Sequence, residues 1–252
     1  MRTIKKVASH IFIDGFGGMT QGLFATLIIG TMIQQIGLLI GGSTGNVIYL
    51  LGKAAAALTS AGIGVGVAVK YGESPLVTVS AAVAAMVGGY AGKITGGTFF
   101  VDGNAVLAGP GEPLGAFIAA FAGITCGHLV SGKTKVDIIV TPVITIGAGS
   151  VVGLLVGPPI SQMMTGLGSI INWATEQRPF IMGIVVSVVM GMVLTLPISS
   201  AALGIILNLS GLAAGAATIG CCCNMVGFAV ASYRENKFGG LVAQGLGTSM
   251  LQ

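Results

Sequence analysis

Charged side chains are scarce in this sequence. Of its 252 residues, 7% are Asp, Glu, Lys or Arg and 54% are hydrophobic, whereas soluble domains average about 25% charged residues. So few charges cannot cover the surface of a soluble protein of this size, and most of that surface must therefore face lipid. The composition excludes a cytosolic enzyme, a nucleic-acid-binding protein and a disulfide-bonded scaffold, and it indicates a membrane protein.

Cysteine is also rare, and no nucleotide-binding loop of the form Gly-x-x-x-x-Gly-Lys-Ser/Thr occurs. The four thiols are Cys126 and the run Cys221, Cys222 and Cys223. Neighbouring residues on a helix point about 100° apart, so three adjacent cysteines rarely converge on one ion. We expect no metal and no cofactor, and we interpret the thiols as small residues packed inside spans.

Apolar stretches recur at lengths that match the core of a bilayer. The fold class they predict is an all-α polytopic membrane protein with seven to eight transmembrane helices. We expect seven spans at about residues 16–40, 47–69, 75–95, 114–131, 137–157, 180–196 and 210–232, and an eighth that begins near Phe238.

Lysine and arginine between the spans predict the orientation, because such residues resist translocation. The cluster Arg2, Lys5 and Lys6 places the N-terminus in the cytoplasm, and the apolar run from Phe16 predicts a retained first span rather than a cleaved signal. The positions of Lys and Arg agree with a cytoplasmic N-terminus for the first five spans, and they leave the orientation ambiguous after Gly157. Residues 160–174 either lie flat in the interface, as Trp173 favours, or dip into the membrane.

Glycine is abundant, with 43 copies. Many lie four residues apart and thus on one helix face, where they let helix backbones approach closely in lipid. The clearest examples are Gly18 with Gly22, Gly123 with Gly127, the series Gly149, Gly153 and Gly157, and Gly211 with Gly215. We predict that these positions pack the spans together.

Two stretches, residues 95–115 and 195–203, contain glycine or proline yet stay nearly uncharged. Irregular backbone at membrane depth persists only where protein buries it or where it lines a cavity, and broken segments of this kind often mark a transporter's substrate site. We therefore predict re-entrant hairpins at both places, with ordinary extramembrane loops as the alternative.

An internal repeat is a further hypothesis. At an offset of 161 residues, residues 22–33 align with 183–194. The chain is then one membrane domain, 1–252, with repeat units 16–157 and 180–252, the second inverted and incomplete. Chance alignment of Gly, Val and Ala is the alternative.

Glu112 is the strongest candidate for a binding residue. It lies between Pro110 and Pro113 in an apolar stretch, and a carboxylate there is costly to bury unless it has a partner or a function. Asp102 and Asn104 belong to the same hairpin and would line the same cavity. A solvated loop carboxylate is the alternative for Glu112.

Three other polar side chains stand out inside or at the ends of apolar spans. His128 either binds a ligand or is satisfied by packing. Of Gln34 and Gln35, we expect one to bond to a neighbouring helix and the other to face a cavity. Lys93 is either a counter-ion for an acid of the hairpin or an end-of-span lysine reaching the interface.

Three segments, residues 12–31, 102–113 and 196–202, resemble the enzyme IIC-like family of bacterial phosphotransferase-system permeases, in the branch that includes toxin-gene regulators. The resemblance implies a multi-pass permease of the bacterial inner membrane, often a homodimer, that passes a sugar or similar solute and is not itself an enzyme. It also implies that phosphorylation needs separate cytoplasmic phosphotransferase subunits, because the chain lacks an enzyme IIB domain. Family members are typically longer than this chain.

The same resemblance bears on the site. Gly111-Glu112-Pro113 is similar to the Glu-Pro motif that binds sugar hydroxyls in better-known members, where a His lies nearby. Here His128 follows the motif, whereas the family's His precedes it. We expect transport by alternating access with Glu112, Asp102, Asn104, His128 and Gln34 as substrate-binding residues. The alternatives are a membrane sensor that binds a ligand without moving it and an ion-coupled transporter.

Overall fold

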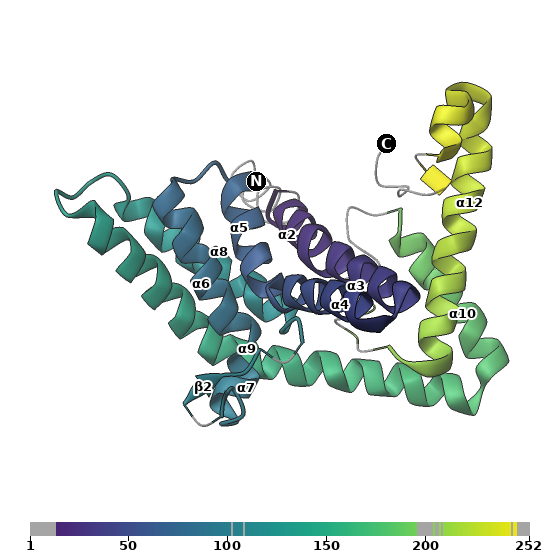
Figure 1. Ribbon diagram of the computed structural model, residues 1–252, viewed down its shortest axis with the longest axis horizontal. Helices are drawn as coiled ribbons and strands as arrows, with labels where there is room; N and C mark the ends of the chain where they lie inside the picture. The colour runs from purple at the N-terminus through teal and green to yellow at the C-terminus, as the bar shows by residue number, and fades with distance from the viewer. Residues whose placement is uncertain are drawn as a thin grey trace, which may run out of the picture. The chain divides into compact units, whose positions relative to one another are not determined.

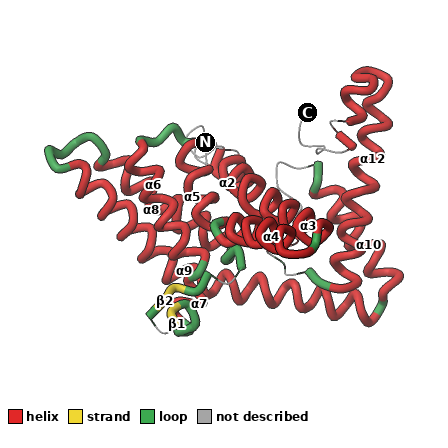
Figure 2. The backbone as a smooth tube through the Cα atoms, in the orientation of Figure 1, coloured by secondary structure: helices red, strands yellow, loops and turns green. Residues whose placement is uncertain are grey.

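The computed structural model describes residues 14–101, 103–107, 109–195, 204, 207, 209–242 and 244–245. These residues are mostly helical, with one short hairpin of strands β1 (Phe100–Val101) and β2 (Asn104–Ala105), as Figure 2 shows. They divide into two compact units, one up to Gln162 and the other from Met163. The predicted all-α class is confirmed.

The first unit begins with an apolar helical run made of α2 (Phe16–Leu23), the π-helix η2 (Phe24–Ile28) and α3 (Ile29–Ile40). A sharp turn at Gly41 and Gly42, both at positive φ, then reverses the chain into α4 (Gly42–Ala57), which packs against α3 (Figure 1).

Helix α5 (Thr59–Lys70) follows α4 and packs on α2 through glycine. A Cβ on Gly18 would lie 2.6 Å from the carbonyl oxygen of Gly66, and a Cβ on Gly22 would lie 2.7 Å from the backbone nitrogen of Ile63. These approaches are too close for any side chain. The predicted packing role of Gly18 and Gly22 is therefore confirmed.

The predicted span 47–69 is not straight. Helices α4 and α5 are bent by 53° at a break, where Leu58 has a non-helical backbone. The N–H of Leu58 donates to the carbonyl of Ala55 at 3.2 Å, and the Thr59 hydroxyl donates to that of Ala56 at 2.6 Å. Such local bonds tighten the last turn and compete with the regular helical ladder.

Helices α6 (Pro75–Gly89) and α8 (Pro113–Val130) pack together and against α5, and glycines also join them to the first part of α9 (Asp137–Gln177). A Cβ on Gly115 would lie 2.7 Å from the carbonyl oxygen of Gly88, and one on Gly149 would lie 2.6 Å from that of Ala119. The short helix α7 (Ala91–Thr95) follows α6 and leads to the β hairpin.

Helix α9 is longer than predicted. The span was expected to end near Gly157, but the helix continues through Pro158 and Pro159 to Gln177. Residues 160–174 are accordingly helical. Prolines within transmembrane helices are tolerated where neighbouring groups satisfy the freed carbonyls, which is why the proline pair does not end this helix.

The second unit contains the end of α9, α10 (Pro179–Val193) and α12 (Gly211–Val242). Ser187 on α10 contacts Ala216 on α12, and Gly191, four residues later on α10, contacts Gly220, four residues later on α12. The two helices are therefore parallel, whereas α2 and α5 are antiparallel. The described contacts do not reproduce the proposed repeat, which stays a prediction.

Four described helical segments are long and apolar enough to cross a membrane, and a fifth crossing results if the bent pair α4–α5 counts as one span. The four are Phe16–Ile40, Pro113–Val130, Asp137–Gln177 and Gly211–Val242. Helices α6 and α10 are apolar but shorter. The number of seven to eight spans thus stays a prediction, although described helices lie within the first seven predicted spans. Most of the predicted eighth span lies outside the described residues.

Candidate functional site

Three interruptions of the helical backbone meet in the first unit. They are the bend at Leu58, the end of α6 at Gly89 and Tyr90, and the segment Gly109–Glu112 that leads into α8. Long-range hydrogen bonds hold the three together. We call this group of residues the break cluster.

Two buried hydroxyls make the longest connections in the break cluster. The Tyr90 hydroxyl contacts the carbonyl oxygen of Ala57 at 3.2 Å and that of Gly109. The Ser60 hydroxyl donates to the carbonyl of Pro110 at 2.9 Å. Tyr90 is 1% exposed and Ser60 is fully buried, so these bonds are shielded from water.

The backbone of Glu112 is anchored in the same cluster. Its N–H donates to the carbonyl of Gly89 at 2.7 Å, and its own carbonyl accepts the N–H of Ala116 at 3.0 Å. Gly111, at a φ of +77°, lets the chain turn into this position. A Cβ there would collide with the Ser60 hydroxyl and approach the carbonyl oxygen of Gly89 at 3.1 Å.

The Glu112 side chain is half-buried and caps the N-terminus of α8. Its carboxylate accepts the N–H of Leu114 at 3.2 Å and the N–H of Gly115. Pro113 occupies the first helical position, where its missing N–H costs nothing. A carboxylate at a helix N-terminus is stabilised by the helix dipole, and hydroxyl-bearing ligands can compete for its lone pairs.

The remaining residues predicted from the hairpin are only partly described. Asp102 lies outside the described residues, as do residues 196–203 of the second broken stretch. Asn104 is exposed on β2, whereas Glu112 is half-buried. The described residues between 95 and 112 form the end of α7, the two β strands and a segment without regular structure, and residues 113–115 begin α8. The entry of this stretch into the membrane stays a prediction.

His128 does not join Glu112. It lies in the last turn of α8, and 16 residues of helix at about 1.5 Å each separate the two by roughly 24 Å. Nδ1 of His128 instead lies 2.9 Å from Oε1 of Glu73, and its side chain is 70% exposed. The two residues cannot contact one small solute together.

The predictions for Gln34, Gln35 and Lys93 stay predictions, and the described contacts of these residues are as follows. Nε2 of Gln34 donates to the carbonyl of Gly30 on its own helix at 3.4 Å. Gln35 is exposed on α3. The Lys93 ammonium lies 5.4 Å from the centre of the Tyr90 ring, a cation–π arrangement.

Sequence reasoning missed Ser60 and Tyr90. Ser60 follows Thr59 inside an otherwise apolar run, and Tyr90 follows two glycines. Hydroxyls in such places indicate hydrogen bonds between distant parts of the chain. The sequence does not reveal that both bond to one segment, 19 residues from Tyr90 and 50 residues from Ser60.

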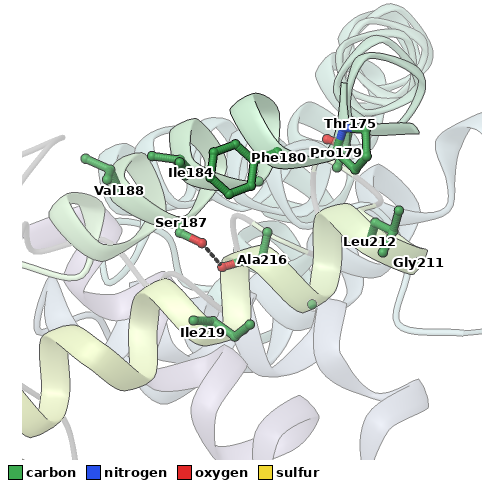
Figure 3. A pocket seen from close by; sticks show the side chains of 12 residues that line it. Thr175, Pro179, Phe180, Ile184, Ser187, Val188, Gly211, Leu212, Ala216 and Ile219 are labelled. Carbon is green, nitrogen blue, oxygen red and sulfur yellow. Dashed lines mark hydrogen bonds between the residues drawn. The ribbon is translucent and has the colours of Figure 1, made fainter. Parts of the chain in front are cut away.

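The second unit has a groove of about 500 Å³ between α10, the start of α12 and the end of α9, shown in Figure 3. The Ser187 hydroxyl donates across it to the carbonyl of Ala216 at 2.6 Å, and the Thr175 hydroxyl donates to that of Ile171 at 2.7 Å. The other lining side chains, such as Phe180 and Ile184, are apolar. The groove therefore offers packing surface rather than polar recognition.

Comparison with known proteins gives one match. The family described as Phosphotransferase system, EIIC matches residues 13–252. No curated protein and no solved structure matches the chain. Within the described residues, no group of three or more His, Cys, Asp or Glu side chains could hold a metal ion.

Proposed function

The chain belongs to the phosphotransferase system EIIC family, and on that premise we propose that it carries a sugar or a similar small polar solute across the bacterial inner membrane. The family and the apolar helices make the chain a multi-pass membrane protein and a permease component. The proposal also includes the kind of solute, the location of the protein in the inner membrane and its assembly as a homodimer.

The break cluster is the single observation that supports this proposal most. Transporters bind their substrates where membrane helices are interrupted, because irregular backbone there exposes polar groups to a cavity. Here a half-buried carboxylate lies where a bent helix pair, the end of α6 and an extended segment come together.

The depth of the cluster is consistent with a transport site. Helix α5 runs 12 residues from Lys70 back to Thr59, which is about 18 Å of helix, whereas the hydrocarbon core is about 30 Å thick. If Lys70 lies at the membrane surface, the bend lies inside the bilayer.

In the proposed mechanism Glu112 accepts hydrogen bonds from solute hydroxyls, and Asn104 and Asp102 assist from the hairpin. The bend between α4 and α5 lets the site face each side of the membrane in turn. His128 lies at the other end of α8 from Glu112, so we assign it no contact with the same solute, whereas Gln34 stays a candidate. Separate cytoplasmic phosphotransferase subunits would supply the phosphoryl group.

Uptake of radiolabelled solutes into proteoliposomes tests the proposal. A panel of monosaccharides, hexitols and amino acids is offered with and without purified phosphotransferase components. Uptake of a sugar that requires those components supports the permease. Binding without uptake favours a sensor, and uptake driven only by an ion gradient favours an ion-coupled transporter. Either result overturns the proposal.

A further inference from the structure

We propose that Tyr90 is a positioning residue of the candidate site, whose hydroxyl couples the bend between α4 and α5 to the segment that carries Glu112. The importance of this coupling for ligand binding rests on the proposed function. The coupling itself is a property of the ligand-free chain and can be measured without a ligand.

The Tyr90 hydroxyl stands between two segments that are far apart in sequence. One acceptor is the carbonyl of Ala57, the last residue of α4, and the other is the carbonyl of Gly109. A phenol has one proton to donate, so the two carbonyls share one donor. Because one hydroxyl holds both carbonyls close, a movement of either segment lengthens one of its two contacts, and the arrangement therefore responds to the bend.

The Tyr90 ring is fixed independently of its hydroxyl. Its centre lies 5.3 Å from that of Phe99 and 5.4 Å from the Lys93 ammonium. Removing the hydroxyl therefore leaves the ring packed, so that Tyr90→Phe changes the two hydrogen bonds and little else.

Further ties join the same segment to the other side of the bend and to α6. Ser60, in the first turn of α5, donates to the carbonyl of Pro110. The N–H of Glu112 donates to Gly89, the residue before Tyr90. Because the segment is bonded both to the end of α4 and to the start of α5, a change in the angle between these helices must displace it and Glu112 with it.

Hydrogen–deuterium exchange on the full chain in lipid nanodiscs tests this coupling. In Tyr90→Phe, amides of residues 58–62 and of residues 111–116 should both exchange about five to ten times faster, the effect of losing one hydrogen bond. Ser187→Ala is the matched control, because it removes a hydroxyl-to-carbonyl bond between helices of the second unit. It should leave both segments unchanged.

Faster exchange in only one of the two segments, or in neither, overturns the proposal. Faster exchange throughout the chain with a lowered melting temperature also overturns it, because the hydroxyl would then be merely structural. Should Tyr90→Phe fail to fold, Ser60→Ala provides the same paired readout from the other side of the bend. Ligand binding that survives Glu112→Gln would refute the proposed site and leave the paired exchange result standing.

Discussion

Glu112 and His128 mark the two ends of a single helix. Glu112 caps the N-terminus of α8, and His128 lies in its last turn. The carboxylate belongs to the break cluster, whereas the imidazole pairs with Glu73 beside the turn between α5 and α6. Any solute held by Glu112 is therefore out of reach of His128.

His128→Gln should leave solute affinity and uptake unchanged. The His128 side chain is 70% exposed and that of Glu73 is 8% exposed, and the amide of Gln can still donate a hydrogen bond to the Glu73 carboxylate. We expect the melting temperature to fall by a few degrees at most. Uptake assays on His128→Gln and on the parent protein check this. A loss of affinity of more than tenfold would show that His128 does take part in solute binding.

Gly22→Ala should lower stability through the contact between α2 and α5. A Cβ there would lie 2.7 Å from the backbone nitrogen of Ile63, and overpacking of this kind costs about 1–3 kcal/mol. Gly17→Ala is the control on the same helix, because the nearest atom to its Cβ is Cε of Lys70 at 3.9 Å. Thermal unfolding in detergent should separate the two variants. Equal melting temperatures would mean that α2 and α5 do not pack this way.

Tyr71 should ionise well above the ordinary pKa of a tyrosine. Burial, followed by the nearby carboxylate of Asp14, raises the pKa of Tyr71 to about 12. Because the folded pKa lies above the ordinary value, the neutral phenol stabilises the fold below pH 10, and this stabilisation is lost between pH 10 and 12. The phenolate difference spectrum between the parent protein and Tyr71→Phe should show a midpoint near 12. A midpoint near 10 would place Tyr71 in water.

The sequence predicts much of the helical layout because composition and helix signals act locally. The apolar stretch 114–131 and the glycines four residues apart correctly predict α8 and a packing role for Gly18 and Gly22. The bend at Leu58 leaves no comparable signal, since the alanines before it favour a helix and the hydroxyl residues Thr59 and Ser60 after it also occur inside straight spans. The continuation of α9 through Pro158 and Pro159 runs against the local signal, because proline usually ends a helix.

The candidate site was predicted in part. Glu112 stands out because a carboxylate between two prolines is rare in an apolar chain. The separation of Glu112 from His128 follows from the predicted span itself, but the family pattern favoured bringing them together. Gly103, at a φ of +77°, lies in the turn of the β hairpin, where an Asp-Gly pair is a strong turn signal. Ser60 and Tyr90 become visible only when the chain is folded.

The turns after α5 and after α8 should both lie in the cytoplasm. The Ser74 and Ser131 hydroxyls are 3.0 Å apart, so these turns are neighbours, and Lys70 and Lys133 favour the cytoplasmic side. Lys133→Cys in a variant without the native cysteines should react with a membrane-impermeant maleimide only after the cells are opened. Labelling of intact cells would overturn the orientation and the count of spans before residue 133.

Glu112→Gln should weaken solute binding by about tenfold to a hundredfold. Hydrogen bonds from hydroxyls to a charged acceptor are worth about 1.5–3 kcal/mol, and each 1.4 kcal/mol is about tenfold in affinity. Gln keeps the shape and one accepting oxygen but loses the charge. It can still cap α8 with that oxygen, so folding and membrane insertion should survive.

Glu73→Gln is the matched control for this measurement, because it neutralises another carboxylate on the first unit, one that pairs with His128 at the far end of α8. Binding of the solute identified by the uptake panel is measured by calorimetry on both variants, with melting temperatures as the check on folding. A selective loss in Glu112→Gln supports the site. Equal affinities in the two variants would reduce Glu112 to a helix cap, and the permease mechanism proposed for this cluster would then be wrong.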